Sequence, residues 1–505
     1  MHSFCSIRGE ACLWLKRYRG RVMNTRDLLP LLAILATGSM SGTLIAATPE
    51  SPSRADTQRP NILFIITDDQ RWDMMGNVTP ALHTPEMDRL AREGVRFEQA
   101  FVTTPICAAS RASLLCGVVE RTHRYTFKTP PLGSRWVDTS FPKLLRDAGY
   151  RTGYVGKFGV NTEHGATQRL YDSFVETGAP YLKKQTDGSM RHLTDLEGDH
   201  AMRFLEERAR TGDGRPFCLT VGFNAPHADD PDPQQYAWQK EVDELYRDMR
   251  VPKPPLSEPE FYNALPEFLR DGTMNRHRWY WRFDFESKRQ QMTKGYWRMI
   301  SGVDLVIGRL RKKLEELHMA ENTVIVLMGD NGMFLGERGY ADKWLPYDPS
   351  IHVPLLMFDP RGKATKPAER PTAFALNIDI PPTLLDIAGI PAPASMQGRS
   401  LVPLSRGEAP AGWRTDVWIE HLMMEPSIRK HEGVRTARYR YSRYFEAEPV
   451  LEELYDLQND PLETVNIVNS PTQQETLHAL RARTDELRAQ YGGEFSKRLW
   501  KEAQR

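Results

Sequence analysis

The chain has 505 residues, of which 40% are hydrophobic and 26% are charged. These values are ordinary for a globular protein with one large core and a smaller one, and they exclude a coiled-coil, collagen-like or disordered chain. The 67 Lys and Arg residues balance the 66 Asp and Glu residues, so no strong positive field points to nucleic acid as a partner. An anionic ligand would have to be bound by a local site.

The N-terminal region has the layout of a secretory signal peptide that begins at an internal methionine. Met23 and Arg26 precede an apolar run at residues 28–35, which is followed by small residues up to Ala47. A membrane anchor is the alternative, but polar and glycine residues at 37–42 interrupt the run, and a span needs ~20 mainly apolar residues. We therefore expect an over-extended start at 1–22, a signal peptide at 23–47 and a periplasmic or secreted mature protein.

Removal of this segment leaves three cysteines, Cys107, Cys116 and Cys218. An odd number does not describe a disulfide scaffold. Whether Cys116 pairs with Cys218 stays open, and one of the three needs another explanation.

Short apolar runs alternate with helical patterns from residue 62 onward. This alternation predicts an α/β fold in which helices cover both faces of a mostly parallel sheet. In chain order, the predicted elements are strand 62–67, helices 85–93 and 141–148, strand 152–155, helix 199–210, strand 217–221, helix 296–317 and strands 323–328 and 353–358. The first three helices end at or near Gly94, Gly149 and Gly212, which we expect to adopt the left-handed conformation of a helix cap.

Two later regions depart from this alternation. Residues 229–286 are rich in Pro, Asp and Arg and read as a long insertion beside the sheet, a kind of segment that is often functional. Its aromatic side chains either stack on a sugar ring or fill a small local core; they are Trp238, Tyr246, Tyr262, Trp279, Tyr280 and Trp281. Farther on, residues 434–445 resemble a strand and 474–490 a closing helix, so we place a large domain at 59–405 and a smaller one at 406–505.

Polar side chains follow four of the predicted strands. In open α/β sheets the ligand crevice lies at the carboxyl ends of the strands. One such residue alone is more often a helix cap, a turn former or a solvated lysine, but four strand ends converge on one crevice. The residues are Asp68 and Asp69, Lys157, His227, and Asp330 with Asn331.

Oxygen ligands dominate this set and suggest a metal. Asp68, Asp69, Asp330 and Asn331 offer carboxylate and amide oxygens, which suit calcium or magnesium better than zinc. Without a cation, three close carboxylates would repel one another. A cation there would act as a Lewis acid.

The most specific motif begins at Cys107. Thr104-Pro105 precedes Cys107-Ala-Ala-Ser110-Arg111, a layout that predicts a loop entering a helix, whose N-terminus can bind an anion. Cys107 and Arg111 are four residues apart and share one helical face, so the guanidinium can neutralise charge beside a reacting group. The alternative is a buried structural cysteine.

This motif, followed by Leu115-Cys116-Gly117, resembles the type I sulfatase signature, in which the cysteine is oxidised to formylglycine. The resemblance continues over residues 59–466, including 61–70, Gly156-Lys157, Pro226-His227, 329–339, Lys343 before Tyr347, and 453–461. It implies the alkaline-phosphatase-like fold with a smaller C-terminal α+β domain that carries a short antiparallel sheet. Bacterial glucosamine 6-O-sulfatase-like members are somewhat similar.

The resemblance also implies roles for individual residues. Asp68, Asp69, Asp330 and Asn331, with residue 107, would bind one calcium ion. Cys107 would become formylglycine through a maturation enzyme, Arg111 and Lys157 would support the nucleophile and the sulfate, and His227 and Lys343 would contact the ester and assist the departing oxygen.

Three positions depart from the family pattern. Gly159 stands where many members have a histidine, although some glucosamine 6-O-sulfatase-like members also lack it. Arg338 replaces a frequent histidine, and Cys116 replaces the usual threonine. The space at Gly159 either admits substrate, with Asn161 and His164 as walls, or belongs to a flexible loop.

The resemblance implies a hydrolase that releases inorganic sulfate from a sulfated carbohydrate or a related sulfate ester. The formylglycine hydrate attacks sulfur with one hydroxyl, and its second hydroxyl then expels sulfate. Two alternatives stay open: a phosphatase or phosphonate monoester hydrolase of the same superfamily, and an inactive relative that binds sulfated glycans. The two-metal phosphatases need histidine ligands, but Asn331 follows Asp330.

Overall fold

The computed structural model describes residues 59–127, 130–362, 372–408 and 410–496. The predicted start and signal peptide at 1–47 lie outside these ranges. Within them, no helix combines the length and the apolar character that a membrane span requires.

The centre of the fold is a seven-stranded sheet in the order β2-β12-β9-β1-β8-β4-β5. Its strands are β1 Asn61–Thr67, β2 Val95–Arg96, β4 Arg151–Gly156, β5 Ser173–Glu176, β8 Phe217–Gly222, β9 Thr323–Gly329 and β12 Leu355–Phe358. β1 runs parallel to both β8 and β9, and β4 runs parallel to β8 and β5. Among the described strands of this sheet, only β12 runs in the opposite direction, antiparallel to both β9 and β2. The predicted mostly parallel sheet is therefore confirmed.

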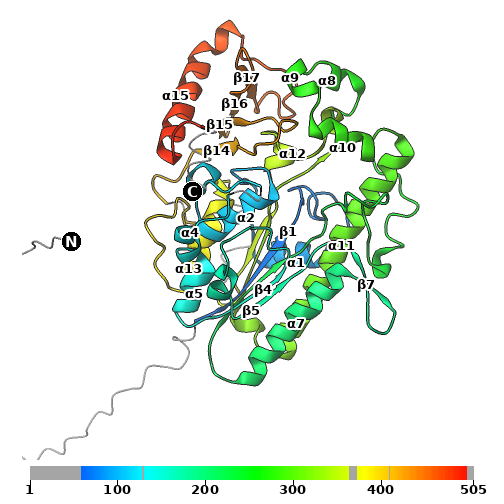
Figure 1. Ribbon diagram of the computed structural model, residues 1–505, viewed down its shortest axis with the longest axis vertical. Helices are drawn as coiled ribbons and strands as arrows, with labels where there is room; N and C mark the ends of the chain where they lie inside the picture. Colours follow the sequence, from blue (N-terminus) through cyan, green and yellow to red (C-terminus); the bar gives the residue numbers. More distant parts are fainter. Residues whose placement is uncertain (1–58, 128–129, 363–371, 409, 497–505) are drawn as a thin grey trace, which may run out of the picture. The chain divides into compact units, whose positions relative to one another are not determined.

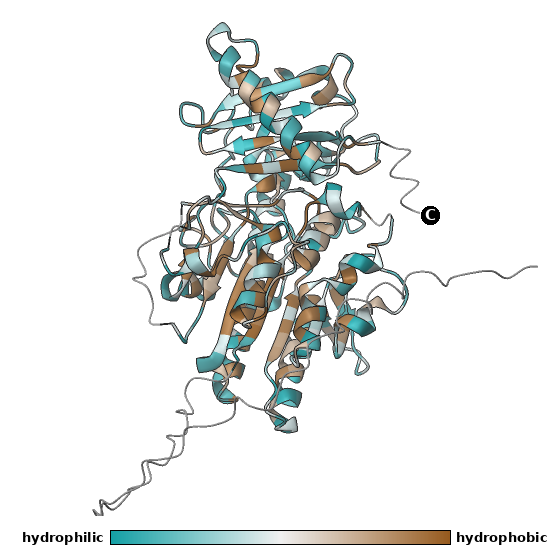
Figure 2. Ribbon diagram, turned by 90° about the vertical axis from the view of Figure 1, so that its left-hand side faces the viewer, coloured by the Kyte–Doolittle hydropathy of each residue, from teal (hydrophilic) through white to brown (hydrophobic). Residues whose placement is uncertain are grey.

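Both faces of the sheet are covered by helices (Figure 1). All seven residues of β1 are buried, and they alternate between two cores because successive strand side chains point to opposite faces. Ile62, Phe64 and Ile66 pack with α2 Cys107–Cys116, α5 Phe141–Asp147 and α13 Ile380–Ile387. Leu63 and Ile65 pack with α1 Pro85–Glu93, α7 Leu193–Thr211 and α11 Glu286–Glu316. Figure 2 shows the hydrophobic strands between the two helical layers.

One of the three predicted left-handed helix caps is wrong. Gly149 and Gly212 have positive φ angles of 93° and 59°, but Gly94 has a φ of −117°. A Cβ on Gly94 would lie 2.3 Å from the carbonyl oxygen of Met357 on β12. Gly94 is therefore required by the close approach of α1 to the sheet, not by its backbone angle.

The predicted strand at 434–445 is also wrong, because it is a hairpin. β15 His431–Thr436 and β16 Tyr439–Tyr444 are the middle strands of a four-stranded antiparallel sheet, flanked by β14 Asp416–His421 and β17 Leu451–Asp456. The Thr436 hydroxyl accepts hydrogen bonds from the Arg438 and Tyr439 N–H groups, which forms the turn without Gly or Pro. The closing helix, α15 Gln474–Tyr491, is as predicted. The domain boundary at residue 406 stays a prediction.

The insertion at 229–286 contains η1 Lys240–Val242, α8 Pro259–Asn263, α9 Glu267–Arg270 and α10 Met274–Arg282. Trp238, Tyr246 and Trp279 pack against the core beside α11, so part of the aromatic set fills a core. Tyr280 and Trp281 are 51% and 36% exposed.

The remaining elements are short. They are β3 Ala100–Phe101, α3 Glu120–His123, α4 Ser134–Asp138, α6 Ala166–Leu170, β6 Leu182–Lys184, β7 Met190–His192, η2 Ala320–Asn322, β10 Phe334–Leu335, η3 Glu337–Gly339, β11 Ala341–Asp342, α12 Asp348–Ile351, β13 Ala375–Leu376, η4 Asn377–Asp379, α14 Val402–Ser405 and η5 Pro471–Gln473.

Candidate active site

The predicted site residues meet at the carboxyl edge of the parallel strands. Loops after β1, β4, β8 and β9 carry Asp68 and Asp69, Lys157, His227, and Asp330 with Asn331. Helix α2 adds Cys107 and Arg111, and the segment after β11 adds Lys343. The register of β1 with β9, which pairs Thr67 with Gly329, places Asp68 beside Asp330.

The acidic residues form one buried group. The backbone N–H of Asp69 donates to Asp330 Oδ1 at 3.1 Å, and Asn331 Nδ2 donates to Asp69 Oδ1 at 2.7 Å. Asp68, Asp69, Asp330 and Asn331 are each at most 2% exposed. Asp69 adopts a left-handed backbone with a φ of 68°, a strained conformation that positions its side chain.

Three cationic side chains surround these acids. Arg111 Nε donates to Asp330 Oδ2 at 2.7 Å, and its Nη2 lies 3.7 Å from Asp68 Oδ2. Lys157 Nζ pairs with Asp68, and Lys343 Nζ pairs with Asp69. Cys107 and Arg111 lie on the same helix, as the motif predicted, and the Arg111 guanidinium pairs with Asp330 and lies near Asp68.

Burial and charge act in opposite directions on these groups. Burial, with the Asp68 charge, raises the pKa of Asp330 to about 7. Burial also acts to raise the pKa of Asp68, but Lys157 and the other cations outweigh it and hold that pKa below its ordinary value. Burial acts to lower the pKa of Lys157 and Lys343, yet their carboxylate partners raise both, so the two ammonium groups stay charged.

Two oxygens in this group have no partner. Asp68 Oδ1 and Asn331 Oδ1 are buried and accept no hydrogen bond from the part of the chain described. A buried oxygen without a donor is costly unless a cation or water satisfies it. Asp68, Asp69 and His227 also offer donor atoms within 4.8 Å of one another. The residues present therefore fit a hard divalent cation.

Cys107 is the first residue of α2 and is 5% exposed. Burial raises the pKa of its thiol more than Lys157 and Lys343 lower it, so the unmodified thiol is a poor nucleophile. It lies in an apolar cluster with Ile106, Ala109, Trp344 and Ile428, against which Phe127, Met274 and Met423 pack.

His227 lies at the rim of the group, with 29% of its side chain exposed. Its Nδ1 lies 2.5 Å from the Ala228 carbonyl oxygen, and its Nε2 lies 3.7 Å from Asp69 Oδ2. Burial and the Lys343 charge lower its pKa, so the free imidazole is neutral. Nδ1 then donates to the carbonyl, and Nε2 faces the acids.

The structure shows the surroundings of Gly159 and Arg338, two of the positions that depart from the family pattern. Gly159 has a φ of 69°, and a Cβ there would lie 3.1 Å from Cδ of Arg111, so this position packs on the guanidinium arm instead of opening a pocket. Asn161 and His164 are exposed, and the Asn161 N–H donates to the Tyr125 hydroxyl. Arg338 is buried and donates to the Leu462 carbonyl at 2.7 Å.

The other two cysteines are structural in the described part of the chain. Cys116 and Cys218 are buried and free, and Cys116 Sγ donates to the Ala112 carbonyl. The open question of a Cys116–Cys218 disulfide is therefore answered in the negative.

Sequence reasoning missed several residues that hold the site. Asn275 of α10 donates to the carbonyls of Ala341 and Lys343 at 2.9 and 2.7 Å. Arg282, 1% exposed, pairs with Asp342 next to Lys343. The only sequence signal near these two residues was the arginine content of the insertion. Their partners lie about 60 to 70 residues farther along the chain, so no local pattern could reveal the contacts.

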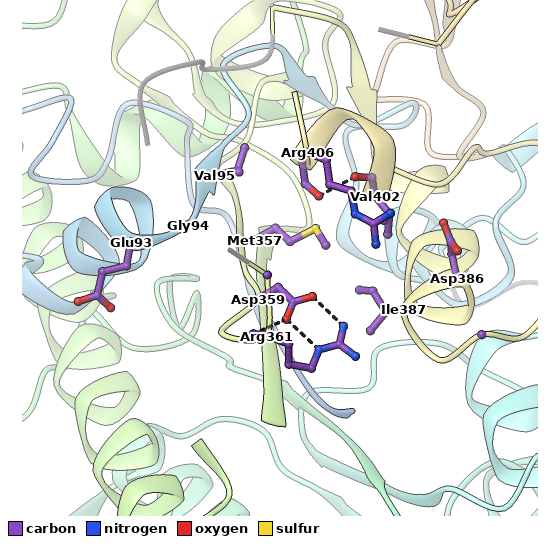
Figure 3. Close-up of a pocket in the computed structure, with 13 residues that line it drawn as sticks. Glu93, Gly94, Val95, Met357, Asp359, Arg361, Asp386, Ile387, Val402 and Arg406 are labelled. Atoms are coloured by element: carbon purple, nitrogen blue, oxygen red, sulfur yellow. Dashed lines mark hydrogen bonds and ion pairs between the residues drawn. The ribbon is translucent and has the colours of Figure 1, made fainter. Parts of the chain in front are cut away.

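A separate cavity of about 420 Å³ lies between α1, β12 and α13 (Figure 3). Its wall includes Met357 and the Asp359–Arg361 ion pair at 2.7 Å. Since Phe358 pairs with Ile325 near the start of β9, this cavity lies at the opposite edge of the sheet from Asp330.

Comparison with known proteins identifies the family. A family model described as Sulfatase matches residues 60–390, and one described as N-sulphoglucosamine sulphohydrolase, C-terminal, matches residues 336–490. The chain belongs to the sulfatase family. Its reaction is the hydrolysis of a sulfate ester.

Individual relatives agree with this assignment. The N-acetylglucosamine-6-O-sulfatase of Bacteroides thetaiotaomicron is 28% identical over 92% of this sulfatase and 90% of the relative. Human N-acetylglucosamine-6-sulfatase is 27% identical over 80% of this chain and 73% of the relative. The solved structure of BT4656 in complex with its substrate D-glucosamine-2-N,6-O-disulfate has a TM-score of 0.74 and 26% identity, covering 86% of this chain and 98% of that one.

Proposed function

We propose that this sulfatase is exported and releases inorganic sulfate from a sulfated carbohydrate, using a formylglycine at position 107 and one calcium ion. The buried acid group has two unpartnered oxygens, and Asp68 and Asp330 of this group act electrostatically on Cys107; this arrangement carries the proposal. The relatives that act on sulfated glucosamine support the substrate class. Export rests on the pattern at residues 23–47.

The calcium ligands would be Asp68, Asp69, Asp330, Asn331 and residue 107, and when bound the ion supplies positive charge that polarises a sulfate oxygen. Formylglycine, as its hydrate, supplies one hydroxyl for attack on sulfur and a second one whose deprotonation allows sulfate to leave. The maturation enzyme that installs it is a required partner.

The chain's own cations bind the sulfate and stabilise its charge. Arg111 pairs with Asp330, and Lys157 pairs with Asp68. Lys343 pairs with Asp69, and its ammonium group, which has three N–H donors, is close enough to act on the charge of His227. In the free enzyme His227 is neutral, and a bound sulfate ester adds negative charge that favours protonation of Nε2. We assign His227 as the donor of the proton to the departing sugar oxygen, with Lys343 as its hydrogen-bonding partner at that oxygen.

The modification of Cys107 is the test. The protein expressed with a maturation enzyme should give a Cys107 peptide with the mass deficit of formylglycine and should release sulfate from glucosamine 6-O-sulfate. Cys107→Ala should lose all turnover, whereas Cys116→Ala, on the same helix, should keep it. An active preparation whose Cys107 is fully unmodified would contradict the proposal.

A further inference from the structure

Helix α10 of the insertion presents one face that begins at the site and ends at the surface. His277, Arg278 and Trp281 lie three, four and seven residues after Met274, so the four residues share one side of the helix. Met274 and Arg278 are half-buried, while His277 and Trp281 are exposed. At 1.5 Å per residue the face is about 10 Å long, roughly two sugar rings.

The inner end of this face is fixed to the reaction site. Met274 packs against the apolar cluster that contains Cys107 and Trp344. The next residue, Asn275, donates to the Lys343 carbonyl at 2.7 Å. The position of α10 is therefore coupled to the side chains that contact the ester.

The outer end carries an exposed aromatic ring that a guanidinium and an imidazole flank. The Arg278 guanidinium lies over the Trp281 ring at 4.6 Å, and the His277 ring lies 4.9 Å from it. Arg278 Nη1 pairs with Asp230 and lies 3.7 Å from Asp342 Oδ2, next to Lys343 in the chain, so two acids balance its charge. Trp281 keeps 36% of its surface exposed, so part of its ring is open to a ligand.

We propose that this face of α10 binds the sugar residue adjacent to the sulfated one, so that the sulfatase acts on oligosaccharides in preference to monosaccharides. The inference rests on the proposed function. The Trp281 ring offers an apolar surface to the C–H face of a pyranose, and the Arg278 guanidinium, held by Asp230 and Asp342, supports that ring from one side. Because the face is continuous with the Cys107 cluster, one substrate chain can occupy both.

The experiment compares substrates of two lengths. kcat/KM for sulfate release is measured with glucosamine 6-O-sulfate and with the two disaccharides that extend it at O1 or at O4. Trp281→Ala should lower kcat/KM for one of the disaccharides about 5- to 20-fold, the range for truncation of one aromatic at a binding surface, and for the monosaccharide less than about 2-fold. Trp281→Phe should restore most of the loss.

Tyr280→Ala is the matched control, because Tyr280 is 51% exposed on a different side of the same helix. It should leave all three substrates unchanged. Equal losses by Trp281→Ala on all three substrates, or no loss on either disaccharide, would overturn the inference while leaving the proposed function intact. Absence of sulfate release from all three substrates by the wild-type enzyme would instead refute the proposed function, and the inference with it.

Discussion

Two of the buried groups of charged side chains in this sulfatase differ in how fully their oxygens are hydrogen-bonded. The first is the acid group at the carboxyl edge of the central sheet. The second is centred on Glu453 of β17. Its Oε1 accepts from the hydroxyls of Tyr347 and Tyr455, and its Oε2 accepts from the Tyr444 hydroxyl and from Arg440.

The two groups are about equally buried, since Glu453 and Asp69 are 1% and 2% exposed. Both oxygens of Glu453 have donors, whereas Asp68 Oδ1 and Asn331 Oδ1 have none in the described chain. A buried charge with a full set of partners holds elements together, and several close acidic residues with unpartnered oxygens can accept a cation. The Glu453 group is therefore structural, while the acid group fits the cation that we propose for it.

The largest effect that this comparison predicts is at Asp330. Asp330→Asn removes a carboxylate from the cation site and the partner of Arg111, so kcat/KM should fall more than about 10³-fold. The variant should lose bound calcium in metal analysis, and added calcium should raise the Tm of the wild type but not that of the variant. Full activity in the chelated, metal-free wild type would rule out the cation site.

Loss of Glu453 should act on stability instead. Glu453→Ala leaves Arg440 and three tyrosine hydroxyls without their shared acceptor, and removal of one partner of a buried ion pair costs about 3–5 kcal/mol. Urea denaturation at saturating calcium measures the loss. Glu452→Ala, the neighbouring position on β17, breaks a more exposed pair with Arg481 and should cost less than about 1 kcal/mol. Similar losses of unfolding free energy in Glu453→Ala and Glu452→Ala would show that burial does not decide how much each ion pair contributes to stability.

His227 and Lys343 should reveal their role through the leaving group. A sugar alcohol leaves far less readily than an activated phenol, so help from a proton donor matters more for it. His227→Ala and Lys343→Ala should each lose about 100-fold more kcat/KM on a sugar sulfate than on an activated aryl sulfate. Equal losses on the two substrates would mean that these residues only bind sulfate.

Most residues of the candidate site could be predicted, because the ends of buried apolar strands can be recognised in the sequence. Asp68, Lys157, His227 and Asp330 each follow a buried apolar strand, and parallel pairing brings those ends to one edge. Lys343 follows only a two-residue strand, and its place came from the family resemblance.

Other features left no local pattern. The turn between β15 and β16 depends on the Thr436 hydroxyl and contains neither Gly nor Pro. The sequence therefore carries no turn signal there, and the pattern over residues 434–445 predicts one strand. The supports from α10 depend on partners distant in sequence, such as Asn275 with Lys343, and no periodicity reports such pairs.

The smallest effect concerns Glu197 of α7, whose hydrogen bonding is intermediate between the two groups. Its Oε1 accepts from Asn224 and Thr177, but its Oε2 is buried without a partner in the described chain. Burial raises its pKa to about 7 from an ordinary 4.5, more than the two hydrogen bonds lower it. The folded protein therefore holds a proton that the unfolded chain releases above pH 4.5. The resulting stabilisation is complete below pH 4.5 and is lost as the pH rises through 7.

Glu197→Gln stays neutral at every pH and should flatten this dependence. The free energy of unfolding of the variant relative to the wild type should rise by about 2 kcal/mol between pH 5 and pH 8. Urea titrations across this range, at saturating calcium, measure it. Glu207→Gln, an exposed position on the same helix, should leave the curve close to that of the wild type. Parallel pH curves for the wild type and Glu197→Gln would mean that Glu197 is ionised in the fold, and that its unpartnered oxygen is satisfied as fully as those of Glu453.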